Sequence, residues 1–121
     1  MSHLKAVAPM LLVRDLQQTI GFYSSKLGFE LVDTWPDDGP PVWCSLRSGG
    51  ARVMFYTGDK PETSPELTGV LYFYPEDVAA IWEKVKDETK VEWPLQEMPY
   101  GMREFAIKDC NGYTLSFGEA V

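Results

Sequence analysis

Apolar residues recur with the spacing of a helix in two segments of the chain, and these segments predict two helices. In the first, Asp15 is a suitable N-cap and Gly28 a suitable C-terminal cap. The stripe between them consists of Leu16, Ile20, Tyr23 and Leu27. The apolar face of the second helix consists of Val78, Ile81, Trp82 and Val85. Both patterns indicate amphipathic helices that cover one face of a sheet.

Short apolar or alternating segments, separated by turns rich in glycine and proline, predict the strands of that sheet. The predicted strands are residues 6–13, 29–35, 42–47, 51–56, 67–74, 90–97, 102–108 and 112–118. A linker rich in Pro, Asp, Glu, Thr and Ser separates the fourth from the fifth. The segments 48–50 and 109–112 are hairpin signals.

The two halves of the chain repeat one pattern at a fixed spacing. Asp15 recurs as Asp77, 62 residues later, and Gly50 recurs as Gly112 at the same spacing. Several elements in one order at one spacing indicate a duplicated supersecondary unit. Each half contains a strand, a helix and three further strands, so the repeated unit is βαβββ.

We therefore predict an α+β fold of two tandem βαβββ modules, about residues 5–58 and 66–119 of a single domain. The strands are expected to form a curved mixed sheet around a cavity, with the helices on the outer face. A chain of 121 residues, 45% of them hydrophobic, is large enough for such a core.

The excess of acidic over basic residues limits which kinds of molecule the protein is expected to bind. A net charge of −7 argues against nucleic acid and is compatible with a cationic small molecule. There is no apolar run of membrane-spanning length and no signal-peptide cleavage site, so we expect a cytoplasmic protein with no membrane partner. Cys44 and Cys110 lack a metal or redox spacing and are expected to be reduced thiols.

Alternation of side chains divides the predicted sheet into two faces. The face under the helices is apolar or aromatic and comprises Leu11, Val13, Val53, Phe55, Leu71, Phe73, Tyr113, Leu115 and Phe117. The opposite face mixes aromatic, thioether, hydroxyl and guanidinium groups and comprises Ala8, Met10, Leu12, Arg52, Met54, Tyr56, Val70, Tyr72, Tyr74, Thr114 and Ser116. This mixture predicts a ligand cavity. The alternative is a partly buried sheet surface or a dimer contact.

Three stretches of the sequence resemble the vicinal oxygen chelate superfamily, which groups glyoxalases, extradiol dioxygenases, fosfomycin-resistance enzymes and bleomycin-resistance proteins. They are Val-Arg-Asp-Leu at 13–16, Phe-Tyr and Leu-Gly-Phe within 22–29, and Arg-Glu-Phe-Ala-Ile-Lys-Asp-Cys-Asn-Gly at 103–112. The resemblance spans essentially the whole chain. It implies paired βαβββ units, a homodimer and, in the enzymes, a divalent metal held by histidine and carboxylate side chains.

The resemblance also implies where the metal ligands of those enzymes would fall, namely on Ala8, Met54, Val70 and Ser116. None of these is a usual oxygen or nitrogen ligand, and Ser116 would be a poor one. The single histidine, His3, lies in the N-terminal tail. We therefore expect no bound metal and no other cofactor.

Among metal-free members, the chain looks most like the bleomycin-resistance proteins, which sequester a flat cationic drug in clefts at a dimer interface. Tyr100 falls where that group has a stacking tryptophan, and Met102 is an extra residue beside it. Trp35 is a second candidate for stacking, and Asp37 and Asp38 are candidate charge partners. The predicted ligand-binding residues are Trp35, Asp37, Asp38, Arg52, Met54, Tyr56, Tyr72, Tyr100, Met102, Glu104 and Ser116, and no residue is assigned a catalytic or metal-binding role.

Simpler roles are open for several of these residues. Trp35 is alternatively a dimer or loop anchor, and Asp37 and Asp38 are alternatively turn formers. Glu104 is alternatively the partner of Arg52 in an ion pair across the sheet.

Three functions follow from these alternatives. The first is a non-catalytic protein that sequesters a small aromatic or cationic ligand as a homodimer. The second is a lyase or transferase-like enzyme that uses metal-free acid–base chemistry, with Glu104 as general base and Arg52 or Tyr56 as electrophile. The third is a scaffold with a vestigial cavity. Whether the protein is an enzyme is open, and the absence of usual metal ligands favours a binding role.

Overall fold

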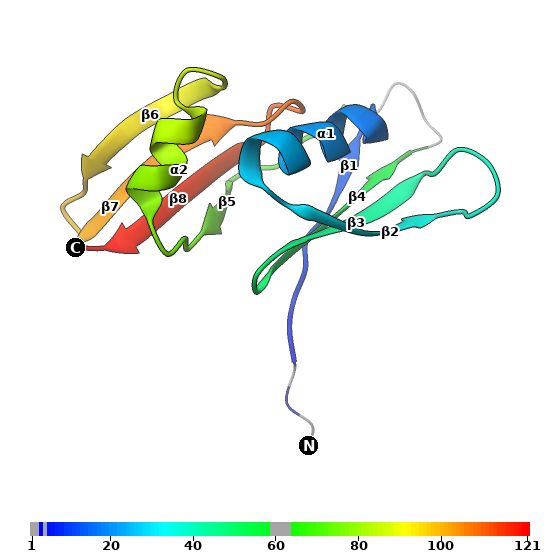
Figure 1. Ribbon diagram of the computed structural model, residues 1–121, viewed down its shortest axis with the longest axis horizontal. Coiled ribbons are helices and arrows are strands. Elements are labelled where there is room, and N and C mark those ends of the chain that lie inside the picture. The colour runs from blue at the N-terminus through cyan, green and yellow to red at the C-terminus, as the bar shows by residue number, and fades with distance from the viewer. Residues whose placement is uncertain (1–2, 4, 59–63) are drawn as a thin grey trace. The chain divides into compact units, whose positions relative to one another are not determined.

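The computed structural model describes residues 3, 5–58 and 64–121, and the chain divides into two compact units. Unit 1, Met1–Pro65, contains β1 (Met10–Val13), α1 (Leu16–Leu27), β2 (Glu30–Trp35), β3 (Trp43–Ser48) and β4 (Ala51–Thr57). Unit 2, Glu66–Val121, contains β5 (Val70–Phe73), α2 (Val78–Val85), β6 (Lys90–Glu97), β7 (Met102–Lys108) and β8 (Thr114–Ala120). Both units have the order βαβββ, which confirms the predicted α+β fold of tandem modules (Figure 1).

Each unit has its own four-stranded mixed sheet, in the order β1-β4-β3-β2 or β5-β8-β7-β6. The first strand lies parallel to the last, with Met10 opposite Met54 in unit 1 and Tyr72 opposite Ser116 in unit 2. Corresponding residues of these two pairs are 62 positions apart. The spacing of the sequence repeat is therefore also the spacing of the sheet register.

Both helices begin directly after the aspartate that the repeat predicts. The carboxylates of Asp15 and Asp77 accept hydrogen bonds from the backbone N–H of Gln18 at 2.9 Å and of Ala80 at 3.1 Å. These bonds satisfy N–H groups that have no partner within the helix. α1 ends at Gly28, whose φ of 72° is a left-handed conformation that glycine adopts without a clash at Cβ.

The apolar face of each sheet packs under the helix of its own unit. In unit 1, the ring of Tyr23 on α1 lies 4.9 Å from that of Phe55 on β4, measured between centroids. In unit 2, the ring of Phe105 lies 5.0 Å from Phe117 and 5.2 Å from Trp82 on α2. Phe55 and Phe117 both belong to the face predicted to lie under the helices, and both are buried.

The largest differences from the predicted strand bounds are at the starts of two strands. β1 begins at Met10 rather than at residue 6, and β5 begins at Val70 rather than at residue 67. Pro9 has no N–H to donate to a ladder, although its carbonyl accepts a hydrogen bond from the N–H of Met54 at 2.9 Å. Before β5, Gly69 has a φ of 131°, which is not strand geometry. Local backbone chemistry therefore sets both starting points.

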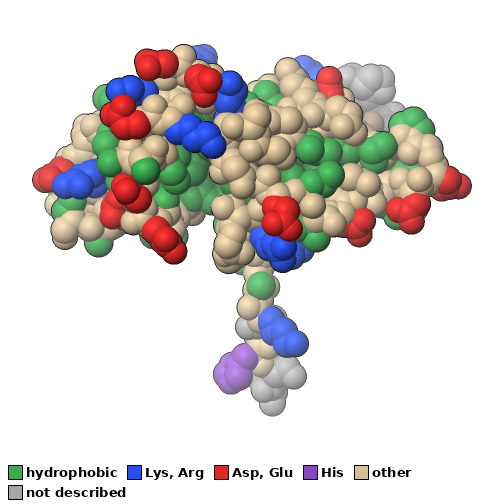
Figure 2. Space-filling model, viewed as in Figure 1, with side chains coloured by type: hydrophobic (Ala, Val, Ile, Leu, Met, Phe, Trp, Pro, Cys, Tyr) green, Lys and Arg blue, Asp and Glu red, His purple; other side chains and the backbone are tan. Residues whose placement is uncertain are grey.

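The surface charges, the two cysteines and the helix lengths do not by themselves indicate a particular binding site. Figure 2 shows acidic and basic side chains interspersed over the visible part of unit 2 around α2. Neither Cys44 nor Cys110 forms a disulfide within the described residues, and burial raises the pKa of the Cys44 thiol to about 11. Of the helices in the described parts of the chain, none is long and apolar enough to cross a membrane.

Candidate functional site

The sheet faces that point away from the helices carry most of the predicted ligand-binding residues. In unit 1, a row of aromatic residues crosses three strands, because Trp35 lies opposite Trp43, and Trp43 lies opposite Tyr56. In unit 2, the corresponding face carries Glu104, which lies opposite Gly118. Residues opposite one another across strands share a face of the sheet. Each unit therefore presents a distinct surface, aromatic in one case and centred on a carboxylate in the other.

Glu104 is unusual because its carboxylate is buried among neutral hydrogen-bond donors. The residue is only 2% exposed. Oε1 accepts hydrogen bonds from the hydroxyls of Tyr100 at 2.6 Å and Tyr72 at 3.0 Å, and Oε2 accepts one from Nε1 of Trp93 at 3.1 Å. None of the ion pairs among the described residues includes Glu104. We call these four residues the Glu104 cluster.

Three separate elements of unit 2 bring the donors to Glu104. Tyr72 lies on β5, Trp93 on β6, and Tyr100 in the turn between β6 and β7. Gly101 forms that turn with a φ of 83°, a conformation that would strain any residue with a β-carbon. The carboxylate thus links the parallel edge strand, the antiparallel edge strand and a hairpin turn.

The structure brings together three residues that the sequence predicted as ligand contacts, namely Tyr72, Tyr100 and Glu104. Trp93, which the sequence did not place in the site, completes the cluster. Gly118 was also missed, and a β-carbon there would overlap the hydroxyl of Tyr72. The sequence signal for Trp93 is its indole N–H, because a partly buried tryptophan usually needs an acceptor. No side-chain signal could have revealed Gly118, since its role is to leave space.

The remaining predicted residues of unit 2 lie beside this cluster without joining its hydrogen bonds. Met102 is partly buried at the start of β7, opposite Ala120. Ser116 is buried, and its hydroxyl donates to the carbonyl oxygen of Phe105 at 3.4 Å. Ser116 therefore presents no exposed hydroxyl to a ligand in this conformation.

Both tyrosine hydroxyls of the cluster are held in the protonated form. Burial, followed by the hydrogen bond to Glu104 and its negative charge, raises the pKa of Tyr72 to about 12. The hydrogen bond to Glu104 also raises the pKa of Tyr100, with a smaller contribution from burial. Both hydroxyls therefore donate to the carboxylate at neutral pH.

We expect this arrangement to be visible in a spectroscopic titration of the tyrosines. Tyrosinate absorbance is measured as a function of pH in the native protein and in Tyr72→Phe, and the difference between the two curves reports Tyr72. The midpoint of this difference should lie near pH 12, above the usual tyrosine pKa of about 10. The folded state holds this proton more tightly, so the stability it contributes is complete below about pH 10 and is lost as the pH rises toward about 12. Repeating the comparison in Glu104→Gln should lower the midpoint. A midpoint near 10 in the native background would contradict the arrangement.

Trp35 and the loop after it lie at the end of the unit 1 sheet. The indole is 62% exposed, and Asp37 and Asp38 are exposed in the loop. The peptide bond between Trp35 and Pro36 is cis, and the carbonyl of Trp35 accepts a hydrogen bond from the N–H of Val42 at 2.7 Å. Neither aspartate forms an ion pair with another described residue. The indole and the two carboxylates are therefore accessible to a ligand.

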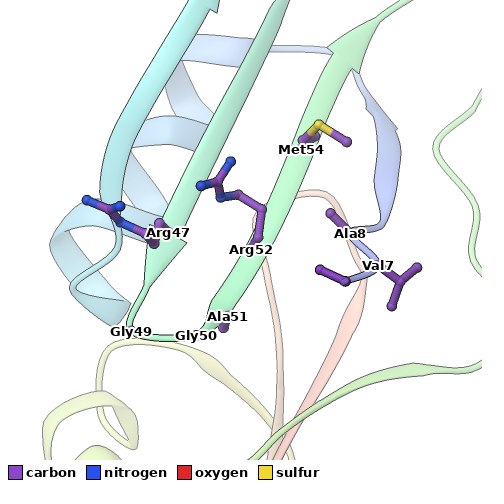
Figure 3. A pocket seen from close by; sticks show the side chains of 9 residues that line it. Val7, Ala8, Arg47, Gly49, Gly50, Ala51, Arg52 and Met54 are labelled. Atoms are coloured by element: carbon purple, nitrogen blue, oxygen red, sulfur yellow. The ribbon is translucent and has the colours of Figure 1, made fainter. Parts of the chain in front are cut away.

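A pocket of about 470 Å³ lies on unit 1, between the N-terminal segment and the β3–β4 hairpin. Figure 3 shows Arg52 and Met54 on β4, Arg47 on β3, and Val7 and Ala8 on the N-terminal segment. The complete lining is Ala6, Val7, Ala8, Arg47, Gly49, Gly50, Ala51, Arg52 and Met54. Arg52 and Met54 were predicted from sequence, whereas Arg47 and the hairpin glycines were missed. We call this the Arg52 pocket.

The divalent metal of related enzymes does not fit these residues. The positions implied by the resemblance are methyl, thioether, isopropyl and hydroxyl side chains at Ala8, Met54, Val70 and Ser116, and the hydroxyl bonds to a backbone carbonyl. Within the described ranges, no three His, Cys, Asp or Glu side chains are grouped so that they could hold a metal ion. The side chains at these positions therefore do not form a metal centre.

Tandem βαβββ units with free sheet faces define a class of small α+β proteins built by duplication. The sequence matches the Glyoxalase/Bleomycin resistance protein/Dioxygenase superfamily over residues 3–117, and the chain belongs to this superfamily. Comparison with curated protein sequences gives no match.

Several solved structures have the same fold. TioX from Micromonospora sp. ML1 is 21% identical, with a TM-score of 0.81 over 97% of this chain and 99% of TioX. TnmS3, an antibiotic binding protein from Streptomyces sp. CB03234, is 20% identical, with a TM-score of 0.79 over 100% and 99%. Lactoylglutathione lyase from Agrobacterium tumefaciens is 20% identical, with a TM-score of 0.70 over 98% and 96%. At these identities the likeness shows a shared fold, which binding proteins and enzymes both use.

Proposed function

We propose that this protein is a cytoplasmic, metal-independent binding protein that sequesters an aromatic small molecule, neutral or cationic, such as an antibiotic or other natural product. The observation that carries the proposal is the Glu104 cluster. Its carboxylate is buried beside aromatic rings and is neutralised by no cationic side chain among the described residues. The neutral donors offset part of the free-energy cost of burying the carboxylate. Because they carry no charge, they do not cancel its negative potential, which attracts a cationic group.

Exposed aromatic rings on each unit support the proposal. Tyr100 is 64% exposed although its hydroxyl is fixed to Glu104 at 2.6 Å. A ring held by its polar end and open on its face is suited to stacking on a flat heteroaromatic group. Trp35 offers a second such surface on unit 1. The antibiotic-binding protein TnmS3 shares the fold, which is consistent with this role.

The proposal includes a homodimer in which the cleft lies at the interface. Met10, Val70 and Tyr74 belong to the free sheet faces and are large, apolar or aromatic, and exposed. Exposed apolar groups on an unpaired sheet face are typical of an interaction surface. Sedimentation equilibrium should give about twice the monomer mass of 13.7 kDa at micromolar concentration. A monomeric mass would contradict the interface cleft.

The enzymatic and scaffold alternatives have less support. A general base must reach a substrate proton, whereas Glu104 is only 2% exposed and its two oxygens already accept three hydrogen bonds. A vestigial cavity would be filled by its own side chains, whereas the Arg52 pocket leaves about 470 Å³ open next to Met54. Both observations favour binding over catalysis or a purely structural role.

We expect a bleomycin-type glycopeptide to bind with saturable heat in isothermal titration calorimetry of metal-free protein. Tyr100→Ala and Trp35→Ala should each raise Kd about tenfold, because each removes a stacking surface that contributes about 1 kcal/mol or more. Phe22→Ala is the matched control, since it removes an aromatic ring from α1, on the other side of the sheet. Equal losses in all three variants, or no saturable heat, would contradict this ligand class.

A further inference from the structure

The Arg52 pocket has a chemistry opposite to that of the Glu104 cluster. We propose that it binds an oxyanion group of the ligand, a carboxylate, phosphate or sulfate, through the guanidinium of Arg52. The inference rests on the proposed function in that it assigns a further ligand chemistry to unit 1.

The charge of the pocket is positive although the protein is acidic. Among the described residues, its lining contains two guanidinium groups and no carboxylate, in a chain whose net charge is −7. Arg47 is neutralised from outside the lining, by Glu30 at 2.8 Å. Arg52 forms no ion pair with any described residue. One uncompensated positive charge therefore remains in the pocket.

The sheet geometry holds this charge in place. Arg52 lies directly opposite Arg47 across β3 and β4, an arrangement of like charges that is unfavourable by itself. Nη1 of Arg52 donates to the hydroxyl of Ser45 at 3.2 Å, and Ser45 is buried. This bond fixes one side of the guanidinium and leaves other N–H groups to bind a ligand.

The position of Arg52 explains how the pocket could bind oxygen atoms without a metal. Ala8 and Met54, at positions where the resemblance implies two metal ligands, both line the pocket. Their side chains cannot hold a divalent cation, but Arg52, two residues before Met54, supplies a cation of its own. A planar guanidinium binds two oxygens of a carboxylate or phosphate in parallel. The small apolar side chains leave room for the organic part of the ligand.

The test uses the metal-free full chain and two small probes, benzoate and phenyl phosphate. Backbone amide resonances of Gly49, Gly50 and Ala51 should shift saturably with both probes in 1H–15N NMR spectra. Benzyltrimethylammonium, an aromatic cation of similar size, should leave these resonances unchanged. The two anions separate planar from tetrahedral oxygen groups, since the tighter binder identifies the group that the pocket prefers.

Matched variants separate the guanidinium from general charge effects. Arg52→Gln should raise Kd for the better anion at least tenfold, and Arg52→Lys should raise it by less because the charge remains. Lys84→Gln, an exposed residue on α2 with the same charge change, should leave Kd within twofold. Saturable shifts that survive Arg52→Gln, or no shift at millimolar anion, would overturn the inference.

The two binding proposals fail separately. If the glycopeptide binds through Tyr100 and neither anion shifts the pocket amides, the proposed function stands and the Arg52 inference is wrong. If an anion binds through Arg52 and the glycopeptide does not bind, the pocket stands and the cationic ligand class is wrong. Retained folding of Arg52→Gln is checked by unchanged amide dispersion in unit 1, outside the pocket, and in unit 2.

Discussion

Replacing Glu104 with alanine is expected to lower the free energy of unfolding by about 3 kcal/mol, because three donors lose a charged acceptor at once. Tyr100 can turn to water, since its ring is exposed, whereas the donors of Tyr72 and Trp93 are partly buried and lose most of their compensation. The change should appear as a lower midpoint in urea unfolding followed by circular dichroism, with an unchanged slope.

Glu104→Gln is the matched control for this prediction. The amide keeps one oxygen that can accept from both tyrosines, but it directs an N–H₂ group at the indole N–H of Trp93. We expect a loss of about half that of the alanine variant, roughly 1–2 kcal/mol. Both variants should also bind the cationic glycopeptide at least tenfold more weakly, because both remove the negative charge. A stable Glu104→Ala variant with native affinity would show that the cluster has neither role.

The fold could be predicted from sequence because its determinants are local and repeated. The capping aspartates Asp15 and Asp77 mark both helix starts, and the spacing of 62 residues recurs in the register of both parallel strand pairs. Alternation assigned Phe55 and Phe117 to the buried face correctly. The strand ends were less predictable, because they depend on backbone details such as Pro9 and the φ of Gly69.

The site was only partly predictable because alternation fails where strands are irregular. The pairing of β6 with β7 shifts register between Val91 and Trp93 and again between Trp93 and Gln96. Each shift changes which residues share a face, so counting along the strand cannot place Trp93 beside Glu104. Tyr100 reaches Glu104 from a turn, to which the alternation of a strand does not apply.

The Arg52 pocket shows a second limit of sequence reasoning. The pattern places Arg52 and Met54 on the free face, but not the cross-strand neighbour Arg47 or the approach of the N-terminal segment. It likewise suggested a pairing of Glu104 with Arg52. In the structure, each has a different hydrogen-bonding partner, Ser45 for Arg52 and the tyrosines and Trp93 for Glu104. Opposite charges in a sequence do not indicate a pair without knowledge of the distance between them.

Phe105 provides the complementary test, because it follows Glu104 on β7 and points to the other face of the sheet. It is fully buried, stacks on Phe117 with a ring separation of 5.0 Å and contacts Trp82 of α2. Phe105→Ala is expected to destabilise the fold by about 3–5 kcal/mol through lost burial and a cavity between α2 and the sheet. Urea unfolding measures this loss, and Phe105→Leu, which keeps most of the volume, should lose less than about 1.5 kcal/mol.

The affinity for the ligand should distinguish Phe105→Leu from Glu104→Gln. At a temperature where Phe105→Leu remains folded, its Kd for the glycopeptide should stay within twofold of the native value, because the helix-side face makes no contact with the proposed cleft. Glu104→Gln, of comparable stability, should lose affinity at least tenfold. If affinity falls in proportion to stability in all these variants, the loss of binding only reflects the loss of folded protein. If Glu104→Gln loses affinity and Phe105→Leu does not, one face of β7 stabilises the fold and the other binds the ligand.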